Sequence, residues 1–415
     1  MRIAIVHYTA PPSVGGVEAV LTAHTRWLLQ AGHAVTIIAG DGAKAALPEG
    51  AELALVPEMA SRHPEVLAAG SELEQGRVPV AFEQLAVRLA DRLDPVLRAS
   101  DWVIPHNIFT KHFNLPLTAA LHRLLDSGAV RHCIAWCHDA TWTSPHSRSK
   151  VHPGYPWDLL RTYRSDVVYV AVSRRRQKEL SELFGCPAEH IRVIYNGVDP
   201  GELLGLSEES QSLVDQFNLV ESDLVLLMPV RVTQAKNIEF ALQVVAALKS
   251  RGLRPSLVVT GPPDPHDAMS LSYYRGLLAL RRRLGVEQEV HFIYETSLGP
   301  GRPRTVEPRV VGDLFRVSDV MFMPSHREGF GMPVVEAGLV GLPVFCAAIP
   351  AGEEIGGEDV TTFAADSDPA EVASRLAAWA EASAVHRLRS RVRQSLTWDQ
   401  LFRREILPLL EGRVS

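Results

Sequence analysis

The sequence predicts an α/β protein with two doubly wound domains, each a parallel sheet with helices packed against it. The chain has 415 residues, and single hydrophobic cores stop growing at roughly 250–300 residues, so two domains are expected. Residues 2–7 (RIAIVH) form a continuous apolar run, which is typical of a parallel strand covered on both faces. An opening of the same kind starts again at residue 223, and this repetition indicates a second domain with the same plan.

The first domain opens with a strand, a glycine-bearing loop and a helix. The loop covers residues 8–16 (YTAPPSVGG), after which apolar residues recur at helical spacing until Gly32. Further apolar segments predict strands at residues 34–40, 100–107, 131–139, 166–173 and 191–200. Residues 58–76 are charged and poorly periodic, and they predict a surface excursion with no assigned role.

Polar residues follow several of these strands directly. They are His106, His138, Ser173 and Asn196. In a parallel sheet, ligands bind beyond the carboxyl ends of the strands, where loops and helix N-termini converge. We therefore expect these four side chains to line one edge of the first domain, on the side that faces the second domain.

The second domain begins after strong turn signals. Residues 195–200 (YNGVDP) contain Asn-Gly and Asp-Pro, which favour turns and place the domain boundary there. The next segments predict a strand at 223–230, a loop at 231–237 (RVTQAKN), an amphipathic helix at 238–252 and a strand at 255–261. This order is a strand–loop–helix–strand unit.

Composition excludes several classes of protein. The net charge of -6 argues against a general nucleic-acid binder. The apolar run at the start of the chain is too brief for a signal peptide, and no stretch approaches 18 apolar residues in a row. We therefore expect a cytoplasmic protein with no nucleic-acid partner.

The four cysteines are scattered and predict no disulfide framework. Cys133 and Cys137 precede His138, which invites a metal site, but the apolar run around them predicts a buried strand. Zinc normally needs a second pair of ligands, and none follows at a suitable spacing. We expect these two cysteines to be core thiols.

Two cations and two carboxylates are predicted to converge in the second domain. Arg231 and Lys236 lie in the loop after its first strand, where a phosphate would meet helix N–H groups and two cations. Glu328 and Glu336 are separated by seven residues in the segment 324–338 (PSHREGFGMPVVEAG). The first lies in a glycine-bearing loop and the second in a helix predicted to begin at Pro333. Both loops should end at the same sheet edge, so the site suits a ligand with phosphates and hydroxyls.

The ordered set of motifs resembles the retaining glycosyltransferases of family 4, which have the GT-B fold. The set comprises Asn-Gly-Val-Asp at 196–199, Arg231 with Lys236, Ser318-Asp319, the segment 324–338, and GGVE and CHD at 15–18 and 137–139. The resemblance implies two Rossmann-like domains facing across a cleft, with a C-terminal helix that crosses back to the first domain. The acceptor-binding domain would be residues 1–197 plus about 395–415, and the donor-binding domain residues 198–394.

The resemblance also assigns roles to residues. Arg231 and Lys236 would bind the diphosphate of the donor. Glu328 would contact the sugar hydroxyls, and Glu336 would hydrogen-bond to the ribose hydroxyls. The remaining donor contacts would come from Gly15, Gly16, Gly329, Phe330 and Gly331. His138 would lie near the reacting sugar, and the catalytic set would be His138, Arg231, Lys236 and Glu328. The acceptor would meet Glu18, His106, Lys111, Asp139 and Arg174. The usual Glu-Ala-Met run is Glu336-Ala337-Gly338 here.

The function implied is transfer of a hexose, of glucose or mannose type, from a nucleoside-diphosphate sugar to a hydroxyl acceptor with retention of configuration. The acceptor would be a small molecule, a glycan or a lipid-linked acceptor, and an anionic one if the basic residues of the first domain bind it. The sugar donor is a co-substrate, and no cofactor or essential metal is expected. Membrane association would be peripheral only, on the cytoplasmic face. The alternatives are a nucleotide-sugar epimerase or hydrolase, and a binding protein without turnover.

The sequence leaves the donor base, the sugar, the acceptor and the oligomeric state open.

The sequence also contains a second candidate metal motif, D-x-D at 366–368. There Asp368, Pro369 and Glu371 fit the first positions of a capped helix better. Residues 386–394 predict an exposed helix, and residues 398–410 an amphipathic one that packs on the first domain.

Overall fold

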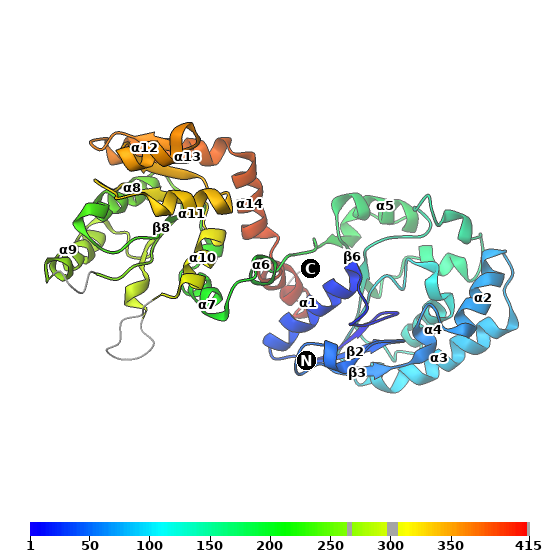
Figure 1. The fold of residues 1–415 in the computed structure, drawn as a ribbon. Coiled ribbons are helices and arrows are strands. Elements are labelled where there is room, and N and C mark those ends of the chain that lie inside the picture. Colours follow the sequence, from blue (N-terminus) through cyan, green and yellow to red (C-terminus); the bar gives the residue numbers. More distant parts are fainter. Residues whose placement is uncertain (264–267, 297–305, 413–415) are drawn as a thin grey trace. The chain divides into compact units, whose positions relative to one another are not determined.

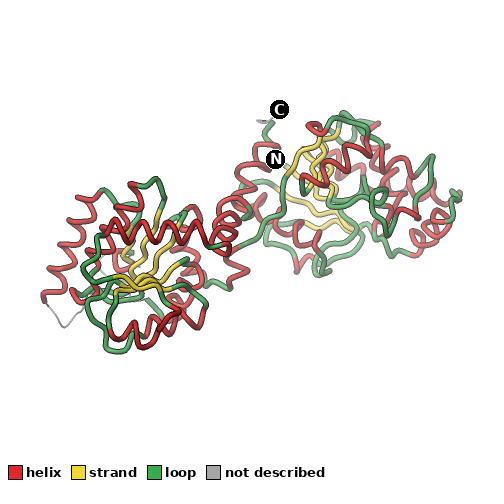
Figure 2. Tube along the Cα trace, turned by 90° about the horizontal axis from the view of Figure 1, so that it is seen from above, coloured by secondary structure: helices red, strands yellow, loops and turns green. Residues whose placement is uncertain are grey.

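The computed structural model describes residues 1–263, 268–296 and 306–412. The chain divides into two units (Figure 1): the first comprises Met1–Gly197 with Trp398–Ser415, and the second comprises Val198–Thr397. In each unit a sheet is flanked by helices (Figure 2).

The first unit contains a seven-stranded parallel sheet with the order β3-β2-β1-β4-β5-β6-β7. Its strands are β1 (Arg2–Val6), β2 (Ala34–Ala39), β3 (Glu52–Leu55), β4 (Trp102–Pro105), β5 (Cys133–Cys137), β6 (Val167–Ala171) and β7 (Ile191–Val193). The strand order reverses between β1 and β4, where Ile5 pairs with Ile104. Ligands of doubly wound sheets bind beyond the strand ends at such a reversal.

The helices of the first unit cover both faces of this sheet. They are α1 (Gly16–Gln30), α2 (Pro64–Glu74), α3 (Val80–Arg98), α4 (Leu115–Asp126) and α5 (Arg174–Phe184). The C-terminal segment adds α15 (Trp398–Leu401), η11 (Phe402–Ile406) and α16 (Leu407–Leu410). Its apolar side chains, among them Phe402 and Leu409, pack in one core cluster with Ile3 and Leu21. This confirms that the C-terminal segment returns to the first domain.

The prediction for residues 58–76 was wrong, because this segment contains α2. Val66, Ala69 and Leu73 are buried on one face of the helix, and Val66 packs in the core with Val56 and Leu85. These apolar residues recur at helical spacing, but Leu67 and Ala68 on the exposed side, with Gly70 between the buried positions, obscured the pattern over only three turns. The segment therefore belongs to the packed body of the unit.

The second unit contains a six-stranded parallel sheet with the order β10-β9-β8-β11-β12-β13. Its strands are β8 (Leu224–Met228), β9 (Pro255–Val259), β10 (Val290–Phe292), β11 (Val320–Met323), β12 (Val344–Ala347) and β13 (Thr361–Phe363). Its helices are α6 (Pro200–Leu204), α7 (Glu208–Gln216), α8 (Ile238–Ser250), α9 (Ala268–Leu284), α10 (Pro308–Val317), α11 (Met332–Val340), α12 (Pro350–Gly356), α13 (Pro369–Ala382) and α14 (Ala384–Ser395). The strand order reverses between β8 and β11, which places the loops after these two strands at the reversal.

The aspartate motif at 366–368 caps α13. The Asp368 side chain accepts a hydrogen bond of 3.0 Å from the Ala370 backbone N–H, and Pro369 is the first residue of the helix. A carboxylate at this position satisfies an otherwise unpaired N–H group and favours the positive end of the helix dipole. The predicted helix cap is confirmed.

The prediction that residues 386–394 form an exposed helix was wrong for one face of α14. Arg393 and His386 are each only 8% exposed. The Arg393 guanidinium donates to both carboxylate oxygens of Asp319 at 3.0 and 3.2 Å, and the Val225 N–H of β8 donates to the same carboxylate at 2.8 Å. Asp319 thus joins the start of β11 to β8 and α14.

Candidate functional site

The loops after β8 and β11 lie side by side at the reversal of the second sheet. The backbone N–H of His326 donates to the Ala235 carbonyl at 2.9 Å, which fastens one loop to the other. The β8 loop then turns through Asn237, whose φ of 51° lies in the left-handed region that asparagine tolerates. Side chains from two distant parts of the chain are therefore held close together.

Lys236 and Glu328 form the central contact between these loops. The Lys236 Nζ lies 2.7 Å from each carboxylate oxygen of Glu328, and the Ser325 hydroxyl donates to Glu328 at 2.7 Å. The side chains of Lys236 and Glu328 are 21% and 8% exposed. A charge-assisted pair at this burial fixes both groups, since either one alone would lose solvation without compensation.

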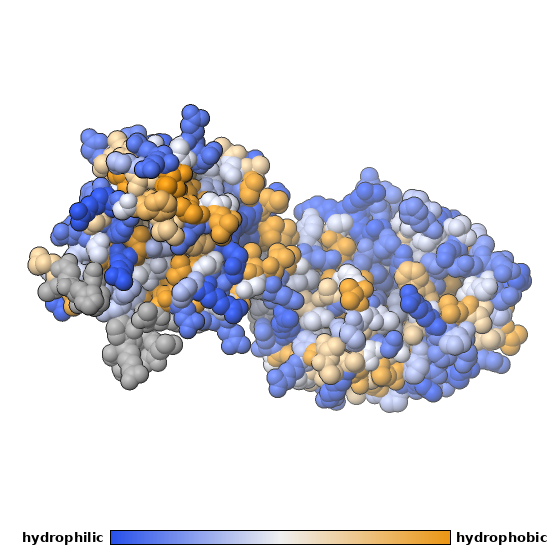
Figure 3. Space-filling view, viewed as in Figure 1, coloured by the Kyte–Doolittle hydropathy of each residue, from blue (hydrophilic) through white to orange (hydrophobic). Residues whose placement is uncertain are grey.

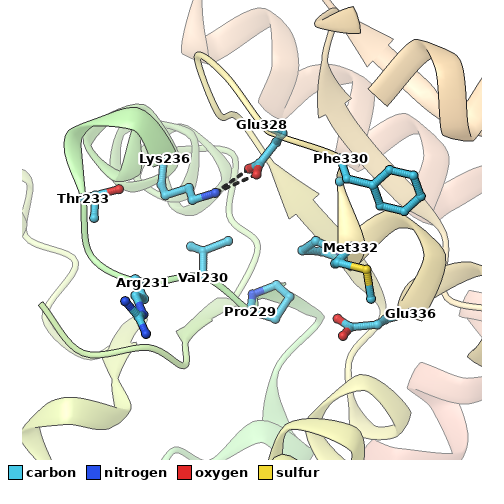
Figure 4. Close-up of a pocket in the computed structure, with 11 residues that line it drawn as sticks. Pro229, Val230, Arg231, Thr233, Lys236, Glu328, Phe330, Met332 and Glu336 are labelled. Carbon is cyan, nitrogen blue, oxygen red and sulfur yellow. Dashed lines mark hydrogen bonds and ion pairs between the residues drawn. The ribbon is translucent and has the colours of Figure 1, made fainter. Parts of the chain in front are cut away.

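A cavity of about 400 Å³ opens beside this pair (Figure 4). Its walls include all four charged residues that the sequence predicted to converge, Arg231, Lys236, Glu328 and Glu336. Figure 4 shows Lys236 and Glu328 on one side and Glu336 on the other, next to Met332. Among the described residues, the lining is Pro229, Val230, Arg231, Thr233, Lys236, Glu328, Phe330, Gly331, Met332, Pro333 and Glu336. The cavity thus offers cations, carboxylates and an apolar wall.

The N-terminus of α11 forms part of this cavity. The helix begins at Met332, one residue earlier than predicted, and Gly331 precedes it with a φ of 91°. Only glycine adopts this conformation without strain, so Gly331 lets the chain turn into the helix. The first N–H groups of a helix lack internal partners and attract anions. Gly329 and Phe330 precede this turn and are exposed.

Apolar side chains gather on the surface over α11 (Figure 3). They include Phe330, Met332, Val335 and Leu339, which are 42–89% exposed. Two of them, Phe330 and Met332, also line the cavity. Apolar side chains therefore form part of the cavity wall, on the side where Glu336 lies (Figure 4).

The loop after β9 packs closely against the β8 loop through Gly261. Gly261 donates its N–H to the Val230 carbonyl at 3.0 Å, and a Cβ at this position would lie 2.5 Å from that oxygen and 2.8 Å from the Arg231 Cα. Backbone atoms cannot make room as a flexible side chain does. The glycine therefore allows the close approach that positions Arg231.

We expect Gly261→Ala to lower any activity that depends on Arg231 by about 10- to 100-fold, because a displacement of about 1 Å in a group that positions a substrate costs up to about 100-fold. Steady-state kinetics would measure the effect. Gly276→Ala is the matched control, since a Cβ there, within α9, meets nothing within 4 Å. Equal activity of the two variants would contradict the supporting role of Gly261.

In the first unit, a group of histidines lies at the reversal between β1 and β4. His106 Nδ1 lies 3.1 Å from His138 Nε2, and His7 Nδ1 lies 3.1 Å from the His106 carbonyl oxygen. Burial, with the neighbouring histidines, lowers the pKa of His106 well below its usual value and that of His138 to about 3. Both rings are therefore neutral near pH 7, and either one can donate or accept a hydrogen bond.

Asn107 holds the loop that carries His138, and sequence reasoning missed it. Its side-chain oxygen accepts hydrogen bonds from the backbone N–H groups of His138 at 2.8 Å and Asp139 at 3.2 Å. Its φ of 62° is left-handed, which asparagine tolerates better than most residues. An asparagine two residues after β4 was the available signal, but its partners lie 31 and 32 residues away.

The glycines and Glu18 lie at the start of α1. Gly15 is the residue before the helix and Gly16 is its first residue; a Cβ on Gly16 would meet nothing within 4 Å. Glu18 accepts a hydrogen bond of 2.6 Å from the Thr9 hydroxyl and lies 3.8 Å from His7 Nε2. The loop between β1 and α1 is thereby tied to the histidine group.

The predicted acceptor residues are only partly gathered. The Lys111 Nζ lies 2.7 Å from the Asp139 carboxylate, and Arg176 lies 3.1 Å from it. Partial burial raises the pKa of Asp139, but the hydrogen bond from Lys111 and both cations outweigh this and hold the pKa below its usual value. Arg174 is exposed at the first position of α5, so Arg176 rather than Arg174 completes this cluster.

The thiols of Cys133 and Cys137 are buried in β5 and pack in the apolar core with Val103 and Tyr169. Burial raises the pKa of the Cys137 thiol to about 12 and also raises that of Cys133. Both are therefore inert core thiols. Among the described residues, no group of three or more histidine, cysteine or acidic side chains is arranged to hold a metal ion.

Two family models match the chain in succession. The model for Glycosyltransferase Family 4 matches residues 14–202, and the model for Glycosyl transferases group 1 matches residues 210–395. The chain belongs to glycosyltransferase family 4. The predicted GT-B fold class is confirmed for this family 4 glycosyltransferase. The chain has two doubly wound units with parallel sheets, and its C-terminal segment packs in the first unit.

The family 4 glycosyltransferase is similar to several known proteins. It is 27% identical over 194 residues to an uncharacterized glycosyltransferase, MJ1607, of Methanocaldococcus jannaschii, a match that covers 46% of this chain and 45% of that protein. It is 27% identical over 187 residues to a D-inositol 3-phosphate glycosyltransferase of Rhodococcus erythropolis, covering 43% of this chain and 38% of that protein. The matches therefore span less than half of the length of either relative.

The solved structure of a glycosyltransferase from Rickettsia africae aligns with 99% of this chain and 98% of its own, at 15% identity and a TM-score of 0.39. Within the part of the chain that the structure describes, every helix is too short or too polar to cross a membrane.

Proposed function

We propose that this family 4 protein transfers a hexose from a nucleoside-diphosphate sugar to a hydroxyl group of an acceptor, with retention of configuration. The observation that carries the proposal is that Arg231, Lys236, Glu328 and Glu336 line one cavity at the reversal of the second sheet. Its volume of about 400 Å³ lies within the range of small-molecule sites. Cations suit the diphosphate, and carboxylates suit the hydroxyls of the sugar and the ribose.

Lys236 can bind the donor without leaving Glu328. An ammonium group has three N–H donors, and the two carboxylate oxygens at 2.7 Å accept two of them. The third can point to a phosphate oxygen, with Arg231 on the same loop adding a planar pair of donors. The contact between Lys236 and Glu328 would thus orient the cation rather than compete with the substrate.

In the proposed reaction, the acceptor oxygen bonds to the anomeric carbon of the sugar while the bond from that carbon to the phosphate oxygen breaks. The electron pair of the broken bond stays on the nucleoside diphosphate, and the acceptor's proton passes to a phosphate oxygen on the same face. Negative charge grows on the leaving phosphate, so fixed cations lower the barrier. A metal ion on the phosphates is not needed when Arg231 and Lys236 stabilise this negative charge.

Glu328 is a poor candidate for a covalent nucleophile. Both of its carboxylate oxygens contact Lys236, and one also accepts from Ser325. These contacts stabilise the anion and lower its reactivity. We assign Glu328 to the sugar hydroxyls and His138 to the neighbourhood of the reacting carbon. A cytoplasmic location stays a prediction.

We expect one of UDP, GDP or ADP to raise the melting temperature of the protein. A ligand at 100 times its dissociation constant stabilises a protein by about 2.7 kcal/mol. A thermal-shift screen with the three nucleotides, each with and without a chelator, would identify the base and test the expected independence from metal. Equal and negligible shifts with all three would contradict the proposal.

A turnover assay separates the proposal from its alternatives. Labelled donor sugars are incubated with the protein with and without acceptors, and free nucleotide and sugar are measured. A transferase releases nucleotide faster when an acceptor is added. A hydrolase or an epimerase is insensitive to the acceptor, and a silent binding protein releases nothing.

A further inference from the structure

The first unit contains a second cavity of about 400 Å³ that the proposed transfer does not yet use. It lies between α2, the turn η3 (His112–Asn114), the start of α4 and the turn η4 (Arg148–Lys150). Its lining is Ser61, Val66, Leu67, Gly70, Ser71, Leu73, Glu74, His112, Phe113, Leu115 and Lys150. The lining thus combines apolar side chains with polar and charged ones.

Two large apolar side chains of the cavity are left uncovered. Leu67 is 56% exposed and Phe113 is 45% exposed. Phe113 is held in place, because its ring packs edge-on against Tyr8 at 5.8 Å and Lys111 Nζ lies 5.1 Å from its centre. A rigid exposed aromatic ring at the rim of a cavity is a good surface for an apolar ligand.

Gly70 keeps this cavity open. It lies within α2, where glycine costs a helix about 1 kcal/mol relative to alanine. Nothing in the backbone requires a glycine, since no positive φ occurs at this position and a Cβ would meet nothing within 4 Å. Because Gly70 has no side chain, it leaves space in the cavity that it lines.

His112 lines the cavity, and its contacts with Thr141 indicate which ring nitrogen carries the hydrogen. Thr141 Oγ1 accepts from the His112 backbone N–H at 3.1 Å and lies 2.9 Å from His112 Nδ1. The hydroxyl hydrogen is then available to Nδ1, which places the ring hydrogen on Nε2. Burial, with Lys150 and Lys111, lowers the pKa of His112 to about 4, so the ring is neutral near pH 7. Lys150 is paired with Glu74 at 3.0 Å.

We infer that this cavity binds the apolar part of the sugar acceptor, an alkyl or aryl group whose polar head lies near His112. Phe113 of the cavity lies 5.1 Å from Lys111 Nζ, and Lys111 is paired with Asp139, so the cavity lies next to two of the predicted acceptor residues. The inference rests on the proposed function where it identifies the ligand as a sugar acceptor. The binding of an apolar group in this cavity does not require the donor. The paired charges of Lys150 and Glu74 favour an uncharged ligand.

The test is a calorimetric titration of the full chain with n-octyl β-glucoside below its micelle concentration, and with methyl β-glucoside. The octyl compound is expected to bind at least about tenfold more tightly, because each buried methylene adds affinity. Gly70→Phe fills the cavity and should abolish the difference. Ala68→Phe adds the same ring at an exposed position of the same helix, outside the cavity lining, and should leave it intact. Circular dichroism checks that both variants fold.

The inference is overturned if the two glucosides bind equally or if Gly70→Phe binds the octyl compound as the wild type does. It is also overturned if the protein binds only phosphatidylglycerol vesicles and no monomeric glucoside, which would indicate a membrane surface. Failure of the proposed function has a different signature: nucleotides do not bind the second unit, while this titration is unaffected.

Discussion

Replacing Lys236 with alanine is expected to lower kcat by about 100- to 1000-fold, the loss typical of removing one donor that stabilises charge in the transition state. The ammonium group would no longer meet the growing charge on the leaving phosphate. Glu328 would also lose the cation that orients it at 2.7 Å. Steady-state kinetics with saturating donor would measure the drop, and KM for the donor should change less than kcat.

Lys249→Ala is the matched control for this variant. Lys249 lies in α8, the helix that follows the same loop, and pairs with Glu289 at 2.6 Å. It is absent from the cavity lining. Lys236→Arg should recover part of the activity, since it keeps the charge with a different geometry. If Lys236→Ala and Lys249→Ala have similar kcat values, Lys236 does not act on the leaving group.

The second large effect concerns stability. Asp319→Ala is expected to lower the free energy of unfolding by about 3–5 kcal/mol, because it leaves the buried Arg393 guanidinium without its counter-ion. The change also removes the acceptor of the Val225 N–H in β8. Urea unfolding followed by circular dichroism would measure the loss.

Arg391→Ala provides the comparison for Asp319→Ala. Arg391 is exposed on the same helix, α14, and surface substitutions usually change stability by less than about 0.5 kcal/mol. A loss below about 1 kcal/mol for Asp319→Ala would mean that α14 is not fastened to the second sheet through this pair.

The second-unit site could be predicted because its parts follow from topology. Arg231 with Lys236, and Glu328 with Glu336, each follow a strand of a parallel sheet, and such strands end at one edge. The reversal between β8 and β11 makes the two loops neighbours. The sequence could not specify the contact between Lys236 and both oxygens of Glu328, because side-chain pairing depends on the final course of two loops.

The features that sequence reasoning missed depend on distant partners. Arg393 reads as one of several exposed arginines until Asp319, 74 residues away, is placed beside it. The sequence does not distinguish Arg174 from Arg176, since both lie in the same run of arginines. Only the orientation of α5 about its axis places Arg176 beside Asp139. The helix α2 was missed for a local reason, since exposed apolar residues and Gly70 lie between its three buried residues and blur the helical period.

The central claim is that four charged groups form a single nucleotide-sugar site. Calorimetric titration with the nucleoside diphosphate found by the thermal-shift screen tests it most directly, on the wild type and on Arg231→Ala, Lys236→Ala and Glu336→Ala. Arg251→Ala, exposed just after the far end of α8, is the control. We predict one binding site per chain, with weaker binding in each of the three variants and wild-type affinity in the control. Unchanged affinity in all three would contradict a shared site.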